Sequence, residues 1–406
     1  MNILILQETD WLTRGPLTPH HIFERISTHP EIEITVLDYD IDQIIKSNSI
    51  FIKTKEHNKV SRVIEDSSVK VIRTAHIQVP YLRRISSLIT NFFKILGIIR
   101  KSQPNIIIGF SMTNGIIGLL LAKIFHIPYI FFYIDKLHEL IPISYLRKIG
   151  RAVSRVSFKL ADSIAVHTKL QQKYVIKEGA EPKKIQIVPD GVDFTNTVIN
   201  RKKLEKLKDE LSIEDQQFVL LFLGYLYEFA GLKEIIDYYS PKVKNRELNL
   251  KFLILGDGGI YSELKKQIEK NKTDWVKLLG RVPFSEITEY IELADLCLMS
   301  FSINDITKEV LPIKIIEYMA MKKPVLSTAL PGVVLELGNQ GGIIFAEDQK
   351  KLIRKIEELS QSMKDFKSIG EQGYKLVKEK YDWNQITKDF KALMFNVIKN
   401  KLDDDF

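Results

Sequence analysis

Short apolar runs alternate along the chain with longer stretches whose apolar residues recur at helical spacing. Strands alternating with helices predict right-handed βαβ crossovers and parallel sheets. Two such series predict an α/β protein with two doubly wound, Rossmann-like domains. The expected strands are Asn2–Leu6, Glu33–Leu37, Lys70–Arg73, Asn105–Ile108, Tyr129–Tyr133, Ser163–His167, Ile185–Val188, Phe218–Leu223, Lys251–Leu255, Val276–Leu279, Leu296–Ser300 and Val325–Ser327.

A charge-dense stretch, "NRKKLEKLKDELSIEDQQ", separates the two series. We therefore expect an N-terminal domain over residues 1–198 and a C-terminal domain over residues 199–381. Open α/β sheets bind ligands beyond the carboxyl ends of their strands. Two such sheets facing each other would enclose a cleft, which is where we expect the functional site.

The apolar stretch over residues 115–134 is long enough to span a bilayer. Lys123, His126 and Pro128 interrupt it, so we interpret it as a helix, a turn and a buried strand. The opening "MNILILQETDWL" lacks a basic leader and is interpreted as a strand, not a signal peptide. A single cysteine, Cys297, cannot form an internal disulfide, which favours a reducing, cytoplasmic location.

The 406 residues carry a net charge of +8, and 45% of them are hydrophobic. This composition excludes a disordered chain and permits full-sized cores. The basic surplus fits acidic small molecules, anionic lipid or nucleic acid, and does not choose among them. We find no nucleic-acid-binding motif and no concentrated basic stripe, so no nucleic-acid partner is expected.

Two glycine-containing segments each lie between an expected strand and an expected helix. They are "FLGYLYEFAGLKEII", with Gly224, and "LILGDGGIYSELKK", with Gly256, Asp257 and Gly258. Such loops let backbone N–H groups approach an anion at a helix N-terminus. The second segment lacks the G-x-G-x-x-G spacing of a dinucleotide fingerprint. Each segment also fits an ordinary turn between a strand and a helix.

Further on, Arg281 follows a strand, either at a ligand site or as a solvated surface residue. Glu309 and Glu317 are eight residues apart in "EVLPIKIIE". Pro312 suits the first turn of a helix, whose free N–H groups can meet phosphate oxygens. Glu317 could then accept hydrogen bonds from vicinal hydroxyls, as on a ribose. The alternative is an ion pair between Lys314 and Glu317.

Together, "ADSIAVHTKLQQKYVIKEGAEPKKIQIVPDGVD", "FLGYLYEFAGL", "LGDGG", "LLGRVPFSEITEYIELADLCL" and "PIKIIEYMAMKKPVLST" resemble a family 4-type, retaining glycosyltransferase of the GT-B fold, in glycosyl transferases group 1. The resemblance is strongest from about Ala161 to Gly342. It implies that the C-terminal domain binds a nucleotide-diphosphate sugar. Glu309 would lie near the sugar hydroxyls and Glu317 on the ribose. Leu311 and Pro312 would meet the diphosphate or sugar, while Arg281 and Val282 would flank the base.

The sequence departs from this family at two basic positions. The arginine after the first glycine is Tyr225, and the lysine before the next glycine is Ala230. These side chains neutralise the diphosphate in the family. We expect Lys233, Arg281 or Lys314 to substitute for them, since a few charge-assisted contacts suffice.

The resemblance also implies that the N-terminal domain binds a glycan, lipid-linked or small-molecule acceptor. Asp135 and His138 follow an expected strand and are candidate catalytic or acceptor-binding residues. Their alternative roles are a helix cap for Asp135 and simple solvation for His138. Candidates on the acceptor side of the first loop are Arg14, Gly15 and His20.

Residues 81–101 have apolar positions at helical spacing together with several arginines and lysines. This basic amphipathic helix either packs on the core with solvated lysines or rests on an anionic membrane. The second possibility would place the protein peripherally on the inner face of the cell membrane. The helix expected over residues 382–400 resembles the last helix of GT-B enzymes, which returns to the N-terminal domain.

The resulting expectation is an enzyme that moves a sugar from a nucleotide-diphosphate sugar to an acceptor hydroxyl with retention, in glycan, polysaccharide or glycolipid assembly. No cofactor or metal is expected: His20-His21 lacks metal-site spacing, and enzymes of this type typically need none. One alternative is a sugar-nucleotide epimerase of the same fold. Another is a non-catalytic partner that has lost the diphosphate-binding arginine and lysine.

Overall fold

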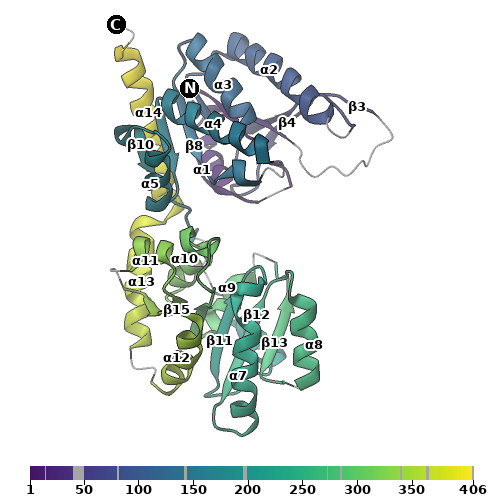
Figure 1. Cartoon of the computed structure of the whole chain (residues 1–406), viewed down its shortest axis with the longest axis vertical. Helices are drawn as coiled ribbons and strands as arrows, with labels where there is room; N and C mark the ends of the chain where they lie inside the picture. Colours follow the sequence, from purple (N-terminus) through teal and green to yellow (C-terminus); the bar gives the residue numbers. More distant parts are fainter. Residues whose placement is uncertain are drawn as a thin grey trace. The chain divides into compact units, whose positions relative to one another are not determined.

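The computed structural model describes residues 1–13, 15–39, 50–79, 82–140, 144–194, 199–271, 273–283, 286–338, 341–362 and 365–404. The chain divides into two compact units (Figure 1). Unit 1 comprises Met1–Asp190 and Trp383–Phe406, and unit 2 comprises Gly191–Asp382. The chain thus leaves unit 1 at Asp190, ahead of the expected position at 198, and returns to it for the last helix.

Unit 1 is built on an eight-stranded sheet in the order β10-β9-β8-β7-β1-β2-β5-β4. All neighbours are parallel except β4, which pairs antiparallel with β5. Its strands are β1 (Asn2–Leu6), β2 (Glu33–Asp38), β4 (Lys55–Val60), β5 (Val69–Arg73), β7 (Ile106–Gly109), β8 (Tyr129–Tyr133), β9 (Ser163–Val166) and β10 (Ile185–Ile187). Two short strands, β3 (Phe51–Ile52) and β6 (His76–Ile77), pair separately.

Helices cover both faces of this sheet. One apolar cluster joins the sheet to α1 and α14, and another joins the opposite face to α2, α3, α4 and α5. Phe390 of α14 lies edge-on to Phe23 of α1, with ring centroids 5.7 Å apart. The helices are α1 (Thr18–Ser27), α2 (Leu82–Ser102), α3 (Thr113–Ile124), η1 (Leu137–Leu140), α4 (Ser144–Leu160), α5 (Lys169–Lys177), η2 (Pro182–Lys184) and α14 (Trp383–Asp404).

In the first half of α2, polar side chains are buried and apolar ones are exposed. This is the reverse of a helix that packs its apolar stripe on the core. Ser87 and Asn91 are buried, whereas Ile85, Ile89 and Phe93 are exposed. The periodicity locates an apolar stripe but does not say which way the stripe points. In these turns the polar face lies inside the protein, so the core-facing interpretation is wrong for this half of α2. In the second half, Ile95 and Ile99 do face the core.

Unit 2 has a six-stranded sheet, all parallel, in the order β13-β12-β11-β14-β15-β16. β11 and β12 are buried at every position, as the continuous apolar runs of central parallel strands require. The strands are β11 (Phe218–Leu223), β12 (Leu250–Leu255), β13 (Val276–Gly280), β14 (Leu296–Met299), β15 (Val325–Thr328) and β16 (Ile343–Ala346). The predicted α/β architecture with two doubly wound sheets is therefore confirmed.

The strand order of unit 2 reverses beside β11. Successive crossovers run from β11 to β13, and the next one returns to place β14 on the other side of β11. The carboxyl ends of β11 and β14 thus form the point at which doubly wound folds bind ligands. The helices are α6 (Arg201–Glu210), η4 (Glu228–Ala230), α7 (Leu232–Lys244), α8 (Tyr261–Asn271), α9 (Ile287–Leu293), η6 (Thr307–Glu309), α10 (Ile313–Ala320), α11 (Pro331–Leu337), α12 (Gln349–Gln361) and α13 (Phe366–Lys380).

Among the described helices of both units, none combines the length and apolar character required to cross a bilayer. The apolar stretch over residues 115–134 contributes to α3 and β8, in line with its interpretation as a helix, a turn and a strand.

Candidate active site

Helix α10 begins beside the carboxyl end of β11. Pro312 is its N-cap residue, in extended conformation. The N–H of Leu223, the last residue of β11, donates to the Tyr318 hydroxyl oxygen at 2.8 Å. This hydrogen bond and the buried side chains of α10 fix the helix on the sheet. Lys314 and Glu317 are only partly buried, on the face that the core leaves uncovered.

The Lys314 side chain lies directly over Gly224. A Cβ placed on Gly224 would be 2.2 Å from Cε of Lys314 and 3.1 Å from its ammonium nitrogen. Gly224 also has a φ of +149°, which favours glycine. Lys314 therefore brings a positive charge to the point where β11 ends, and a side chain at position 224 would displace the flexible end of the lysine.

Burial shifts both titratable groups of α10 toward their neutral forms. It lowers the pKa of Lys314 and raises the pKa of Glu317, and the attraction between the two charges opposes each shift only in part. No ion pair within 4.0 Å joins them, and neither side chain has a hydrogen-bond partner among the described residues. The pair expected as the alternative therefore exists as an attraction between the two charges, without direct contact. A half-buried cation and a half-buried carboxylate without hydrogen-bond partners are suited to a ligand that supplies both the anion and the hydrogen-bond donors.

The loops after β11, β12 and β13 meet at the same edge of the sheet. A Cβ on Gly256 would lie 1.8 Å from the Gly224 carbonyl oxygen, so these two loops touch through their backbones. The N–H of Leu226 donates to the Asp257 carbonyl oxygen at 3.0 Å. Nε of Arg281 lies 3.5 Å from Oδ2 of Asp257. The candidates Gly224, Gly256, Asp257, Gly258, Arg281 and Val282 are thus brought together.

Glu309 lies in the loop between β14 and α10. Asn304 and Thr307 organise this loop: the Thr307 hydroxyl donates to the Ser302 carbonyl at 2.6 Å, and the Asn304 side chain accepts from the N–H of Thr307 at 3.0 Å. Glu309 ends η6 and is exposed. Leu311 then leads into the N-cap of α10. Glu309 and Glu317 therefore flank one short connection at the ligand-binding end of the sheet.

Of the three candidate replacements for the missing basic residues, Lys314 alone extends over the end of β11. Lys233 lies in the first turn of α7, and its ammonium is 2.8 Å from Glu263 and 3.4 Å from Glu228. These carboxylates raise its pKa and already neutralise it. The Arg281 side chain is largely exposed beside Asp257.

Aromatic side chains occupy the loop where the family has its arginine. Tyr225 and Tyr227 are exposed, with ring centroids 4.5 Å apart, and Tyr227 stacks on Phe229 at 4.6 Å. The sequence made Tyr225 a donor-binding candidate, at the position of the family's arginine, but Tyr227 and Phe229 were overlooked. The alternation of aromatic residues in "YLYEF" was the available signal.

In unit 1, Asp135 and His138 follow β8. Asp135 is exposed and accepts a hydrogen bond from the N–H of Lys136 at 2.7 Å. His138 is buried, which lowers its pKa, so it is not a solvated residue. Its Nδ1 has no hydrogen-bond partner among the described residues.

The first loop of unit 1 corrects one expectation. Arg14 lies outside the described residues, and Gly15 is exposed. His20 is fully buried: the N–H of Leu17 donates to its Nδ1 at 3.0 Å, and its Nε2 donates to the Trp11 carbonyl at 2.9 Å. Burial lowers its pKa to about 4. Both ring nitrogens serve the local fold, so His20 does not face an acceptor.

Two family models match the chain. One, described as "Glycosyl transferases group 1", matches residues 217–362, and the other, "Glycosyltransferase Family 4", matches residues 52–196. The first covers most of unit 2 with the α10 site, and the second covers most of unit 1. The chain belongs to the group 1 glycosyltransferases.

Named relatives agree with this membership. The glycosyltransferase is 22% identical over 337 residues to the capsular polysaccharide biosynthesis glycosyltransferase CapM of Staphylococcus aureus, covering 80% of this chain and 86% of CapM. It is 20% identical over 255 residues to an uncharacterized glycosyltransferase of Methanocaldococcus jannaschii, covering 61% of this chain and 62% of that relative. For a second uncharacterized glycosyltransferase of that organism, at 28% identity, the match covers 41% of this chain and 44% of the relative's length.

Solved structures share the fold. Anabaena HepE, crystallised in complex with UDP, has a TM-score of 0.71 at 14% identity, covering 98% of this chain and all of HepE. WaaG, a glycosyltransferase involved in lipopolysaccharide biosynthesis, has a TM-score of 0.63 at 15% identity, covering 97% of this chain and 99% of WaaG. At these identities the similarity shows the GT-B fold alone.

In the described part of the glycosyltransferase, no group of three or more histidine, cysteine, aspartate or glutamate side chains is arranged to hold a metal ion.

Proposed function

We propose that this glycosyltransferase transfers a sugar, with retention of configuration, from a nucleotide-diphosphate sugar to an acceptor hydroxyl in polysaccharide or glycolipid assembly. The observation that carries the proposal is the placement of Lys314 and Glu317, which lack hydrogen-bond partners among the described residues, at the carboxyl end of β11. The cation fits a diphosphate, and the carboxylate fits the two hydroxyls of a ribose. HepE was crystallised with UDP and with UDP-glucose, and CapM acts in capsular polysaccharide biosynthesis, which supports the same class of donor and product here.

The reaction breaks the bond between the sugar's anomeric carbon and the β-phosphate oxygen. The acceptor oxygen bonds to the same carbon on the same face, and its proton passes to the departing diphosphate. Lys314 and the N-terminal N–H groups of α10 stabilise the charge that develops on this leaving group. Glu309 orients the sugar hydroxyls, and Glu317 holds the ribose. No metal or other cofactor enters this scheme.

On the acceptor side, Asp135 is the exposed polar group at the end of β8 and is assigned to the acceptor. His138 supports the turn that carries Asp135, because it is buried within η1. In this assignment Asp135 orients the attacking hydroxyl, and the diphosphate accepts its proton.

Calorimetric titration with UDP, GDP, ADP and CMP tests the donor site. One diphosphate is expected to bind, and Glu317→Gln and Lys314→Gln should each weaken it by about 10-fold or more, the effect of losing a hydrogen bond to a charged group. Glu358→Gln, on the exposed surface of α12, serves as the matched control and should change nothing. Binding that survives both site variants unchanged would place the nucleotide elsewhere. Isomerisation of the nucleotide sugar without an acceptor would indicate the epimerase alternative.

We also propose a peripheral membrane contact through α2 and its neighbours, consistent with a lipid-linked acceptor. Helices α2, α3 and α4 lie side by side over one face of the sheet (Figure 1). Their sequences contain five, one and five arginine or lysine residues and no aspartate or glutamate. In the part of the chain that the structure describes, Glu56, Asp162 and Glu178 of other segments pair with some of these cations. The charged side chains of the three helices themselves are all basic, which attracts anionic lipid.

The same layer exposes large apolar side chains. They are Leu82, Ile85, Ile89, Phe92 and Phe93 on α2, Leu120 and Ile124 on α3, and Tyr145, Ile149, Val156 and Leu160 on α4. Apolar side chains interspersed with basic ones, without acidic residues, fit the interface of an anionic bilayer.

Co-sedimentation with vesicles tests this contact. The protein should bind phosphatidylglycerol vesicles and not phosphatidylcholine vesicles, with binding that weakens at high salt. The triple variant Ile85→Ser, Ile89→Ser, Phe93→Ser keeps every charge and should lower vesicle binding by about 10-fold or more without lowering the melting temperature. Leu402→Ser on α14 is the matched control, since Leu402 is 56% exposed, as Ile89 is. Equal binding by the triple variant and the control would rule out an apolar contact through α2.

A further inference from the structure

An aromatic set, Tyr225, Tyr227 and Phe229, follows β11 in unit 2, where the family has its arginine. Tyr225 and Tyr227 are 49% and 42% exposed, with ring centroids 4.5 Å apart. Tyr227 stacks on Phe229 at 4.6 Å, and Phe229 lies edge-on to the buried Phe301 at 5.1 Å. The two tyrosines are thus supported by a row of rings that ends in the core, while part of each tyrosine remains open to solvent.

Backbone hydrogen bonds fix the loop that carries the aromatic set. Leu226, between the two tyrosines, is fully buried, and its N–H donates to the Asp257 carbonyl oxygen at 3.0 Å. The N–H of Ser302 donates to the Phe229 carbonyl oxygen at 2.8 Å, so the loop also touches the segment that follows β14. Rings on a fixed backbone lose little conformational freedom when a ligand binds them, which favours binding.

The sheet order places the aromatic set beside the sugar of a nucleotide sugar, away from its base. Across the sheet the strands run β13, β12, β11 and β14. Arg281 follows β13, and Lys314 extends over the end of β11. Tyr227 and Phe229 contact Phe301, just after β14, on the other side of β11. A nucleotide sugar with its base near β13 and its diphosphate at Lys314 therefore brings its sugar to the tyrosines.

The positive charge at the end of β11 is small for a site that binds a diphosphate. Of the three candidate replacements for the family's basic pair, Lys314 alone extends over this strand, and Lys233 is already paired with Glu228 and Glu263. A nucleoside diphosphate carries more than one negative charge, so a single lysine neutralises it only in part. An aromatic ring adds affinity of another kind, because it packs against the C–H face of a sugar and buries apolar surface.

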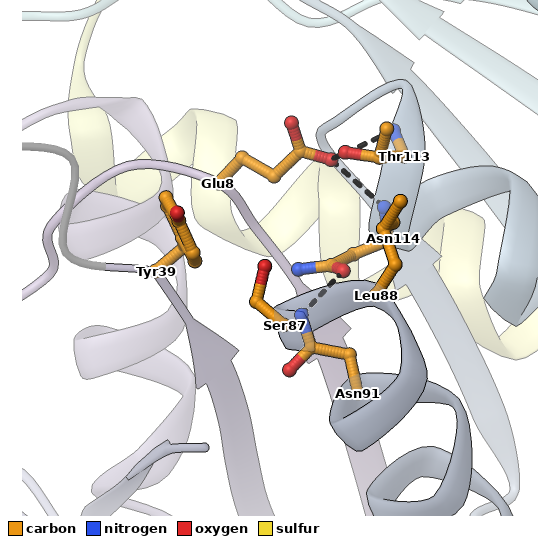
Figure 2. A pocket seen from close by; sticks show the side chains of 7 residues that line it. All are labelled: Glu8, Tyr39, Ser87, Leu88, Asn91, Thr113 and Asn114. Atoms are coloured by element: carbon orange, nitrogen blue, oxygen red, sulfur yellow. Dashed lines mark hydrogen bonds between the residues drawn. The ribbon is translucent and has the colours of Figure 1, made fainter. Parts of the chain in front are cut away.

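A sugar ring needs an open surface such as this one, and a hollow in unit 1 illustrates the contrast (Figure 2). The hollow has a volume of about 30 Å³, which is room for one or two water molecules. Oε1 of Glu8 accepts from the N–H of Thr113 at 2.7 Å, and Nδ2 of Asn91 donates to Oδ1 of Asn114 at 2.8 Å. These bonds hold α2 and α3 at the ends of the strands and leave no space for a sugar.

We infer that Tyr225 and Tyr227 bind the transferred sugar of the donor, so that this enzyme recognises its donor chiefly through the sugar. The inference rests on the proposed glycosyl transfer. The class of sugar that fits is one with a continuous C–H face, which packs flat on a tyrosine ring. The nucleotide sugar then binds more tightly than the nucleoside diphosphate, and the diphosphate left after transfer departs readily.

Calorimetry on the full chain with UDP, UDP-glucose, UDP-galactose, UDP-N-acetylglucosamine, GDP and GDP-mannose tests this inference. At least one nucleotide sugar should bind about 10-fold or more tightly than its own nucleoside diphosphate. The double variant Tyr225→Ser, Tyr227→Ser should remove most of this difference and change the affinity for the nucleoside diphosphate by less than about 2-fold. The double variant Tyr225→Phe, Tyr227→Phe keeps both rings and should keep the difference.

Tyr225→Arg restores the family's residue and gives a test in the opposite direction. The added guanidinium should raise the affinity for the nucleoside diphosphate by about 10-fold, the effect of gaining a hydrogen bond to a charged group. The advantage of the nucleotide sugar should shrink accordingly, because one of the two rings is lost.

Tyr238→Ser is the matched control. Tyr238 lies on α7, is 39% exposed, and packs edge-on against the ring of Tyr239 at 5.0 Å. The Lys242 ammonium lies over its ring, 4.8 Å from the centroid, so this tyrosine already has its partners. The control should change neither the affinity for the nucleotide sugar nor the affinity for the nucleoside diphosphate.

Three results would overturn the inference. In the first, every nucleotide sugar binds no more tightly than its nucleoside diphosphate. In the second, the serine variant weakens both ligands by the same factor. In the third, the serine variant slows transfer with unchanged donor affinity, which would assign the rings to the acceptor. The donor proposal is judged separately, by the effect of Lys314→Gln and Glu317→Gln on the nucleoside diphosphate. If none of these ligands bound, the donor proposal and the inference would both fail.

Discussion

Lys314 and Gly224 act as a pair, because the lysine occupies the space that any side chain at position 224 would need. Gly224→Ala would place a methyl group 2.2 Å from Cε of Lys314 in a conformation that L-residues rarely adopt. The displaced ammonium should no longer meet the diphosphate, so we expect nucleotide affinity to fall by about 10-fold in calorimetry. Gly259→Ala is the control, since a Cβ there meets no atom within 4 Å. Equal losses in the two variants would argue against the pairing.

The opposite pKa shifts of Lys314 and Glu317 predict a narrow pH window for donor binding. The carboxylate must be ionised and the ammonium protonated. The pKa of Glu317 is raised above 4.5, so affinity should fall on acidification before an ordinary glutamate would titrate. The pKa of Lys314 is lowered below 10.5, so affinity should also fall early on the alkaline side.

Measuring the affinity for UDP-glucose at a series of pH values should show a loss of affinity on both the acidic and the alkaline side. Lys314→Arg should remove the alkaline limb, because arginine stays charged over this range. Glu317→Gln should remove the acidic limb. A profile that is identical in the wild type and both variants would show that the limbs have another origin, such as the base of the ligand.

At this scale the sequence specified part of the candidate site and left part open. The spacing of Glu309, Pro312 and Glu317, together with the family resemblance, indicated the donor loop. It did not indicate which of three basic residues extends over β11, because this depends on which face of α10 the core covers.

Among the elements, the carboxylate of Glu178 links α5 to α4 through two ion pairs. Glu178, the C-cap residue of α5, forms ion pairs with Arg151 and Arg155 of α4. These arginines lower the pKa of Glu178 to about 2, from an ordinary value of 4.5. A depressed pKa means that the stabilisation is complete above pH 4.5 and is lost as the pH falls toward 2.

Glu178→Gln should therefore lower the melting temperature of unit 1 at neutral pH, by roughly 2–4 °C for each kcal/mol lost. The difference from the wild type should shrink in scanning calorimetry as the solution is acidified. Glu181→Gln provides the comparison, since Glu181 is exposed and pairs only with the surface residues Lys183 and Lys184. Equal shifts in both variants would contradict the special role of Glu178.

Apolar patterning alone is sufficient to predict the bounds of some strands and not of others. β1, β8 and β11 match the expected ranges, because central parallel strands are continuous apolar runs. β4 and β16 were not predicted. β4, with the sequence "KEHNKV", is an antiparallel edge strand that is largely exposed, so it carries no apolar run to detect. β16 is a short edge strand of four residues.

At the scale of the whole molecule, the last helix completes a unit that the first 190 residues begin. Phe390 is 1% exposed against the sheet of unit 1, whereas Phe395 on the same helix is 48% exposed. Phe390→Ala should cost about 3–5 kcal/mol of unfolding free energy. Phe395→Ala should change it by less than about 0.5 kcal/mol.

Hydrogen exchange resolved by peptide would show where the loss falls. Protection should decrease throughout unit 1 in the Phe390 variant and remain unchanged in unit 2. A uniform decrease in both units would show that the two units unfold together.

The return of α14 has a consequence for synthesis in the cell. The ribosome finishes residues 1–190 and must then translate all of unit 2 before the segment containing Phe390 emerges. At ordinary elongation rates this interval is roughly 10–40 s. During it, the part of the first sheet that α14 will cover, including Phe132, lacks this helix. The nascent chain therefore depends on chaperones most strongly midway through translation, and unit 2 has the opportunity to fold first.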